Sequence, residues 1–160
     1  MLTFVEQPHT LRIDMLAPEQ LHDFWPMLKR GLEGILKKAS HSPDWQPEDV
    51  YAYLRCQKAV AYLAFYRGRY VAFTVCYLNP LPFSGRQELI VWCGWGIPMK
   101  ERYPDDNQDL VWAALWEQMR EAARRAGAVR IATLTTRPGY HKQASKVGLT
   151  ASFTRYESAL

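Results

Sequence analysis

Residues 117–131 read EQMREAARRAGAVRI, the point at which a long amphipathic helix gives way to a strand. Leu115, Met119 and Ala122 recur three or four positions apart, which is the spacing of one helix face. Gly127 is the kind of residue at which a helix ends. Three residues upstream are typical of a helix start: Asp105, Asp106 and Asn107. The pattern predicts a helix that ends at Gly127 and a strand over 128–135.

On either side of this unit, strand and helix patterns are interleaved. Period-two alternation and aromatic or β-branched runs predict strands over 11–15, 60–66, 70–78, 88–95 and 149–156. Helical spacing predicts helices over 18–36, 47–54 and 140–147. Pro26, Gly31 and Gly34 predict a kink or break in the first helix. The order β-α-α-β-β-β-α-β-α-β predicts one α/β (α+β) domain over 1–160, with a mixed central sheet and helices on both faces.

Length and composition limit the class of protein. The 160 residues are 48% hydrophobic, which suffices for one domain with a buried core. No run approaches the roughly 20 apolar residues that cross a bilayer, and Met1 to Thr10 lack the pattern of a signal peptide. Three cysteines without a CxxC pair and four scattered histidines predict neither a zinc site nor a disulfide framework. We therefore expect a cytoplasmic protein with no membrane or metal partner.

The net charge of +4 is unevenly distributed. From residue 120 onward there are eight basic and two acidic residues, a net charge of +6, whereas the first 119 residues carry −2. This basic segment favours an anionic partner: a phosphate-bearing cofactor, a nucleic acid or an acidic protein. A solvated helix face explains it equally well. Nucleic acid is the least favoured partner, because the aromatics are not regularly interleaved with bases.

Local patterns and the order of elements are shared with a known superfamily. Residues 117–131 resemble its long helix, glycine stop and following strand, and residues 144–149, ASKVGL, resemble the end of its next helix. Gly68 and the tripeptide 71–73, VAF, are similar to its hairpin. Over about residues 11–158 the chain resembles the GNAT superfamily of acetyl-CoA-dependent N-acetyltransferases, and it is similar to GNAT-like proteins of bacteriophages. The resemblance implies transfer of an acetyl group from acetyl-CoA to an amine of a small molecule or protein.

The resemblance also implies where the cofactor lies. In the family, acetyl-CoA lies between the fourth and fifth strands, with its pyrophosphate on backbone amides at the start of the long helix. The corresponding stretch here, residues 100–109, contains no glycine. A backbone N–H in residues 95–97 is expected to stabilise the oxyanion. The residues expected to bind the cofactor are Trp95, Gly96, Ile97, Lys100, Arg102, Asn107 and Thr135.

Two side chains are expected to move protons. Ala144 stands where many members carry a tyrosine, so Tyr140, one turn earlier on the same helix, is the candidate acid for the leaving thiolate. Glu88 matches the place where some members carry a general base, provided that burial raises its pKa toward neutrality. The plainer interpretations are a packed surface aromatic for Tyr140 and a solvated strand-start residue for Glu88.

The alternative function is a non-catalytic protein on the same scaffold that binds a host or virion protein. The glycine-free stretch 100–109 and the many tryptophans favour it. Trp112 and Trp116 lie four residues apart on one helix face, partly off the apolar stripe. Exposed tryptophans often mark a protein-binding surface. Packing in the core is the commoner role for such residues.

Overall fold

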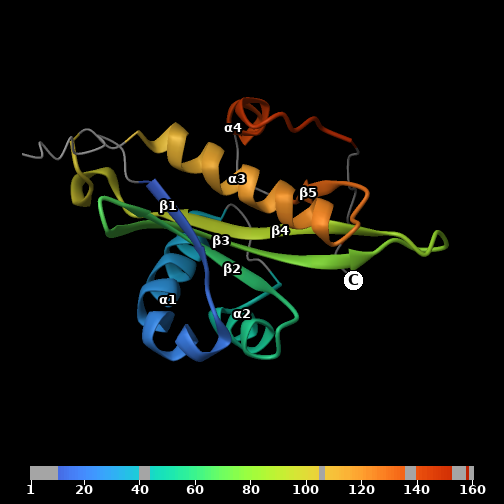
Figure 1. The fold of residues 1–160 in the computed structure, drawn as a ribbon, viewed down its shortest axis with the longest axis horizontal. Coiled ribbons are helices and arrows are strands. Elements are labelled where there is room, and N and C mark those ends of the chain that lie inside the picture. Colours follow the sequence, from blue (N-terminus) through green and yellow to red (C-terminus); the bar gives the residue numbers. More distant parts are fainter. Residues whose placement is uncertain (1–10, 40–43, 105–106, 136–139, 153–157, 159–160) are drawn as a thin grey trace, which may run out of the picture.

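The computed structural model describes residues 11–39, 44–104, 107–135, 140–152 and 158. Five strands form one sheet in sequence order, from β1 to β5 (Figure 1). The pairings from β1 to β4 are antiparallel, and β4 pairs with β5 in parallel, so the predicted mixed sheet is confirmed. The strands are β1 (Leu11–Met15), β2 (Val60–Tyr66), β3 (Arg69–Pro80), β4 (Gln87–Gly96) and β5 (Ile131–Thr133).

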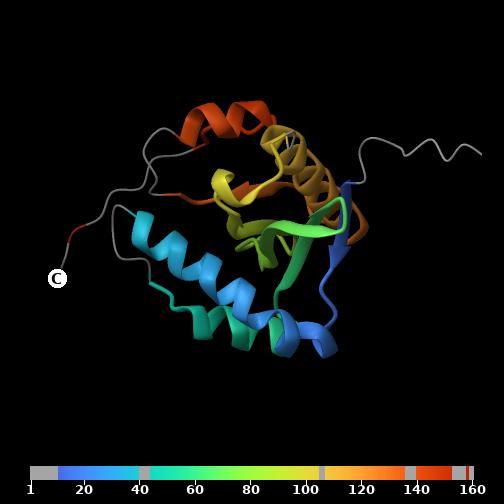
Figure 2. The ribbon, with the colours of Figure 1, turned by 90° about the vertical axis from the view of Figure 1, so that its left-hand side faces the viewer.

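Helices cover both faces of the sheet, as predicted. Helices α1 (Leu21–Lys38) and α2 (Pro47–Arg55) lie on one face (Figure 1, Figure 2). Helices α3 (Gln108–Arg125) and α4 (Tyr140–Lys146) lie on the other side. Short 3-10 turns over Pro18–Gln20 and Met99–Glu101 precede α1 and follow β4.

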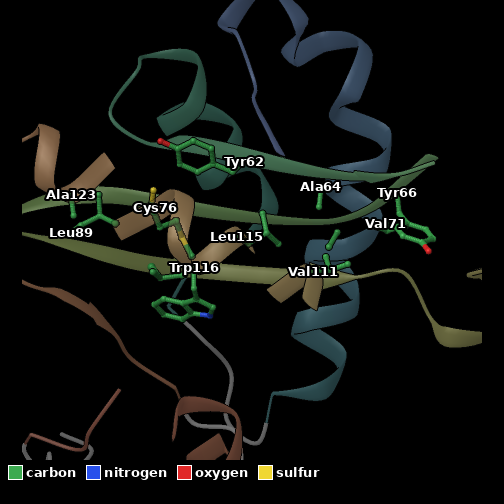
Figure 3. Close-up of a cluster of buried hydrophobic side chains, with 13 residues drawn as sticks. Tyr62, Ala64, Tyr66, Val71, Cys76, Leu89, Val111, Leu115, Trp116 and Ala123 are labelled. Carbon is green, nitrogen blue, oxygen red and sulfur yellow. The ribbon is translucent and has the colours of Figure 1, made fainter. Parts of the chain in front are cut away.

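A hydrophobic cluster fills the space between the sheet and α3 (Figure 3). Every second residue of a strand faces the same side, so Tyr62 and Tyr66 of β2 point toward α3 together. From α3, Leu115 and Met119 are fully buried and Trp116 is 5% exposed. This cluster explains the long apolar stripe of α3.

Helix α1 is continuous from Leu21 to Lys38 and contains Pro26, so the predicted break is wrong. Gly31 and Gly34 lie about one turn apart and face the sheet. A Cβ atom on Gly31 would lie 2.5 Å from Cε1 of Phe73, and one on Gly34 would lie 2.7 Å from Cη2 of Trp95. The glycines therefore serve close packing of the helix on β3 and β4.

Among the described residues, the C-terminal part of the chain contains less strand than predicted. β5 covers Ile131–Thr133 of the predicted 128–135. Residues 149–152 form no strand, and residues 153–156 of the predicted last strand lie outside the described residues. Val129 donates its N–H to the Gln87 carbonyl, so the approach to β5 does contact β4 as expected.

Candidate active site

The sheet opens between β4 and β5. Their last pair is Val91 and Thr133, where the Thr133 hydroxyl donates to the Val91 carbonyl over 3.0 Å. Directly afterwards, the register of β4 against β3 shifts by one residue, which makes Trp92 a β-bulge. A bulge bends its strand and ends regular pairing. β4 runs on to Gly96 without β5 beside it, and this segment is called the open edge below.

Two glycines supply the polar groups of the open edge. In an antiparallel ladder, alternate residues bond to the partner strand and the residues between them point the other way. The Ile97 N–H donates to the Val71 carbonyl over 2.9 Å, which fixes this alternation. Gly94 and Gly96 consequently direct their N–H and C=O groups away from β3. Of residues 95–97, where the oxyanion donor was expected, Gly96 directs its N–H away from β3, and Gly94 does the same.

Side chains on the α3 side approach these glycines closely. A Cβ atom on Gly94 would lie 3.2 Å from Cζ3 of Trp112, and one on Gly96 would overlap Nη2 of Arg102. The lack of a side chain at both positions therefore lets Trp112 and Arg102 reach the backbone of β4. One face of the open edge is closed in this way.

Arg102, predicted to bind the cofactor, is instead engaged with the backbone. It is 7% exposed, its Nε donates to the Ile97 carbonyl over 2.6 Å, and its Nη2 donates to the Val71 carbonyl over 3.3 Å. These bonds fix the end of β4 against the start of β3. Lys100, two residues earlier, is exposed.

The start of α3 is occupied by its own cap. The Oδ1 atom of Asn107 accepts hydrogen bonds from the N–H groups of Asp109 and Leu110, over 3.1 and 3.3 Å. The Asp109 carboxylate lies 3.2 Å from Nζ of Lys146 at the end of α4. Asn107 therefore caps the helix as the sequence indicated, and these two amides already have an acceptor.

An aromatic cluster lines the opposite face, toward α2. The ring of Trp92 makes edge contacts with the rings of Trp45, Tyr53 and Tyr77, at centroid distances of 6.0, 5.3 and 5.7 Å. Tyr53 is 42% exposed, so the cluster reaches the surface. Because the bulge places Trp92 on this side, the aromatic cluster borders the point where the sheet opens.

Of the two interpretations of the tryptophans, packing in the core is supported and an exposed surface is not. All six tryptophans are described, and each is buried or half-buried. Trp116 packs into the cluster between α3 and the sheet, and Trp112 lies over Gly94. Trp95 packs against α1, with Lys38 Nζ 4.9 Å from its ring centroid. Large rings reach the core here because glycines make room for them.

Glu88 is held in a partly buried polar contact at the other end of β4. Its Oε2 accepts from Nε of Arg130 over 2.6 Å, and its Oε1 accepts from Nδ2 of Asn79 over 3.2 Å. The hydrogen bond from Arg130 lowers the pKa of this carboxyl below its usual value, with Asn79 adding to the effect against burial. The expected rise of the Glu88 pKa is therefore wrong. Glu88 also lies six residues from Gly94, roughly 20 Å along an extended strand.

Tyr140 and Thr135 lie beyond β5. Thr135 is exposed, two residues after β5 ends, and Tyr140 is half-buried at the first position of α4. Both follow β5, whose end at Thr133 leaves the rest of β4 without a partner on that side. Glu88, in contrast, lies next to the part of β4 that pairs with β5.

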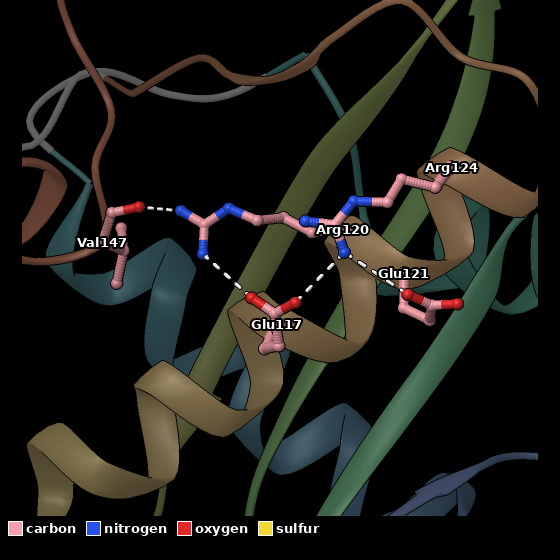
Figure 4. Close-up of polar contacts among 5 residues, drawn as sticks. All are labelled: Glu117, Arg120, Glu121, Arg124 and Val147. Atoms are coloured by element: carbon pink, nitrogen blue, oxygen red, sulfur yellow. Dashed lines mark hydrogen bonds and ion pairs between the residues drawn. The ribbon is translucent and has the colours of Figure 1, made fainter.

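Four basic residues of the described part of the basic segment are paired within the chain: Arg120, Arg124, Arg130 and Lys146. Arg120 donates to the Val147 carbonyl and lies 3.7 Å from Glu117 (Figure 4). Arg124 bonds to both Glu117 and Glu121 (Figure 4). The bond from Arg120 to Val147 holds the residue after α4 against α3, and the other pairs lie within α3. They also leave the helix face less positive than the sequence count implies.

Within the described ranges, no helix is long and apolar enough to cross a membrane. The same residues hold no group of three or more His, Cys, Asp or Glu arranged for a metal ion.

Solved structures of acetyltransferases share this fold. A probable acetyltransferase matches with a TM-score of 0.69 and 20% identity, over 93% of this chain and 97% of its own. The ribosomal-protein-alanine N-acetyltransferase from Brucella melitensis biovar Abortus 2308 matches with 0.66 and 18%, over 94% and 100%. The aminoglycoside N-acetyltransferase AAC(6')-Iy in complex with CoA matches with 0.69 and 14%, over 98% of both chains. No protein-family model and no curated protein matches the chain.

These similarities define the class of fold. The chain has the α+β fold of the GNAT acetyltransferases, which confirms the fold predicted from the sequence. We did not predict from the sequence that Trp112 lies over Gly94 or that Asp109 contacts Lys146. The spacing of Gly94 and Gly96, two apart in a strand, was the available signal for a close approach by other groups.

Proposed function

We propose that the chain is an N-acyltransferase that moves an acyl group from a thioester to an amine at the open edge. One observation carries the proposal: β4 continues past its last pair with β5, and Gly94 and Gly96 direct N–H and C=O groups to that side. Such an edge binds an extended, amide-containing chain in the way that a sheet adds a strand. The donor implied by the fold, acetyl-CoA, contains a chain of this kind in its pantetheine arm.

The two ends of acetyl-CoA, the pantetheine arm and the diphosphate, differ in how well they fit this chain. The pantetheine arm is uncharged and carries two amide groups, and the bare backbone at Gly94 and Gly96 offers them partners. The diphosphate does not fit the start of α3, because Asn107 already occupies the amides of Asp109 and Leu110. Binding is therefore assigned to the open edge and not to the helix start.

The chain itself positions the reactants and stabilises charge. When bound, the donor supplies a thioester carbonyl that an amine attacks directly. The N–H of Gly94 or Gly96 is the proposed donor to the carbonyl oxygen, where negative charge develops. Tyr140 is the proposed acid for the leaving thiolate, and Thr135 is a proposed contact of the pantetheine arm. Glu88 has no part in the proposal.

The acceptor is proposed to be a cationic amine, of a small molecule or a protein, that reaches the opening beside the aromatic cluster. The supporting observation is the cluster around Trp92, which borders the opening and reaches the surface at Tyr53. Aromatic faces attract ammonium groups. The amines named for similar structures, an aminoglycoside and a ribosomal-protein alanine, are substrates of those proteins and illustrate both sizes.

The test compares two substitutions at one glycine. Gly96→Pro removes the N–H directed at the open edge, whereas Gly96→Ala keeps it and introduces the same Cβ atom beside Arg102. Thiol release from acetyl-CoA and from acetyl-pantetheine, with a panel of amines, should be about 100-fold slower in the proline variant, because one oxyanion donor contributes about that factor. Equal rates in the two variants would remove Gly96 from the proposal. If the unaltered chain binds neither donor and releases no thiol, the whole proposal fails.

A non-catalytic role in binding a host or virion protein is the second function expected from the sequence. It relied on exposed tryptophans, and all six are buried or half-buried. No tryptophan surface therefore favours it over acyl transfer.

A further inference from the structure

The start of α3 is poorly suited to bind a diphosphate. Free N–H groups at a helix start bind phosphates well, because the helix dipole adds to the hydrogen bonds. Here Oδ1 of Asn107 accepts from the amides of Asp109 and Leu110, which are the second and third residues of the helix. A phosphate oxygen would have to displace that side chain to reach them.

The charges around this helix start also oppose a diphosphate. The Asp109 carboxylate lies in the first turn of α3 and pairs with Nζ of Lys146 over 3.2 Å. Arg102 is buried on backbone carbonyls. Glu101 pairs with Arg30 of α1 over 2.9 Å. A diphosphate placed here would therefore compete with Asp109 for Lys146 and would meet a like charge.

The open edge has the opposite character. Gly94 and Gly96 present uncharged N–H and C=O groups. The rings of Trp112 and Trp95 lie beside them, and the guanidinium group of Arg102 next to Gly96 donates to the carbonyls of Ile97 and Val71. Such a surface suits a neutral, extended chain with amide groups. The open edge is chemically suited to the pantetheine arm. It is not suited to a nucleotide diphosphate.

We propose that the acyl donor is recognised by its pantetheine arm alone, so that the substrate class is a pantetheine thioester whose nucleotide diphosphate contributes nothing to binding. The arm can be free or attached to a carrier protein, since both present the same thioester and amides. This inference rests on the proposed acyl transfer and narrows its donor.

Calorimetry on the full chain tests the inference with four ligands. Acetyl-pantetheine and acetyl-CoA should bind with dissociation constants within about threefold of each other, and adenosine 3′-phosphate 5′-diphosphate should not bind at about 1 mM. A carrier protein with an acetylated arm separates the two sources: tighter binding than acetyl-pantetheine identifies a protein-borne donor, and equal or weaker binding identifies a free one. Binding of the nucleotide, or acetyl-CoA at least about 30-fold tighter than acetyl-pantetheine, overturns the inference and leaves acyl transfer standing. Absence of binding by every donor overturns both.

A gain of affinity provides the second test. Asn107→Gly together with Asp109→Asn frees two amides and removes one negative charge, while glycine remains an acceptable cap. Acetyl-CoA should then bind about tenfold tighter, and acetyl-pantetheine should be unchanged. Asp49→Ala is the matched control, because it removes the side chain that accepts from the Gln46 N–H at the start of α2. An unchanged affinity for acetyl-CoA in the double variant, with an intact fold by circular dichroism, contradicts the inference.

Discussion

Replacement of Gly34 by alanine should destabilise the protein, although the same change stabilises most helices. Alanine is favoured over glycine inside a helix by about 1 kcal/mol. At this position the new Cβ atom would lie 2.7 Å from Cη2 and Cζ2 of Trp95, closer than packed carbons approach. Overpacking of this kind costs about 1–3 kcal/mol. We therefore expect a net loss of about 1 kcal/mol, or a melting temperature lower by about 2–4 °C for a chain of this size.

The effect of Gly34→Ala on the free energy of unfolding should change sign when the ring of Trp95 is removed. Leucine at position 95 does not extend to the outer ring atoms that Gly34 faces, so Gly34→Ala in a Trp95→Leu background should stabilise by about 1 kcal/mol. The coupling between the two positions is then about 2 kcal/mol, which is the range seen for residues in direct contact. Urea denaturation of the four proteins of this cycle, followed by circular dichroism, measures it. Glu33→Ala, at an exposed neighbouring position, controls for propensity alone.

One result would refute the reasoning. If Gly34→Ala changes the free energy of unfolding by the same amount and with the same sign in both backgrounds, the ring of Trp95 does not limit the approach of α1. The close packing of α1 on β4 would then need another cause.

Two further outcomes are expected from buried groups. Glu88→Gln should lower the free energy of unfolding by about 1 kcal/mol at neutral pH, and this loss is small because Arg130 is exposed. The substitution should have no effect on the free energy of unfolding once the pH falls well below 4.5. The sign follows from the lowered pKa of Glu88, since its carboxylate stabilises the fold only while ionised; urea titrations at both pH values measure this, and an equal loss at both would contradict it. Of the three thiols, only Cys56 should react rapidly with a disulfide reagent in the folded protein, because burial raises the pKa of Cys76 to about 12 and also raises that of Cys93. Complete reaction in urea is the control, and a second fast thiol would count against the buried positions.

The order of the elements was predictable because local patterns dominate it. The helix that ends at Gly127 carries its own apolar stripe, and Asn107 has the chemistry of a cap wherever it precedes a helix. The tight turn at Gly68 likewise follows from its neighbours, and its φ of 75° is one that glycine adopts readily. Residues that act through neighbours in sequence can be interpreted from the sequence.

The site was less predictable because its contacts join distant parts of the chain. Arg130 reaches Glu88 from 42 residues away, and this contact changes the expected direction of the Glu88 pKa. Gly34 signals a helix break by propensity, and only the ring of Trp95 shows why a continuous helix needs it. A period-two count along β4 also fails at Trp92, because one residue there has no partner of its own on β3.

That unpaired residue has a consequence for how such an opening can arise. Val75 pairs with Cys93 and Cys76 pairs with Val91, so the partners on either side of Trp92 are consecutive on β3. Trp92 amounts to an insertion of one residue, which leaves every other pairing of the strand as it would be without it. Its deletion should straighten β4 and draw it toward β5, with the far glycines still facing outward. The opening therefore depends on the presence of one residue, Trp92. A sheet of this kind can gain or lose the opening through the insertion or deletion of a single codon.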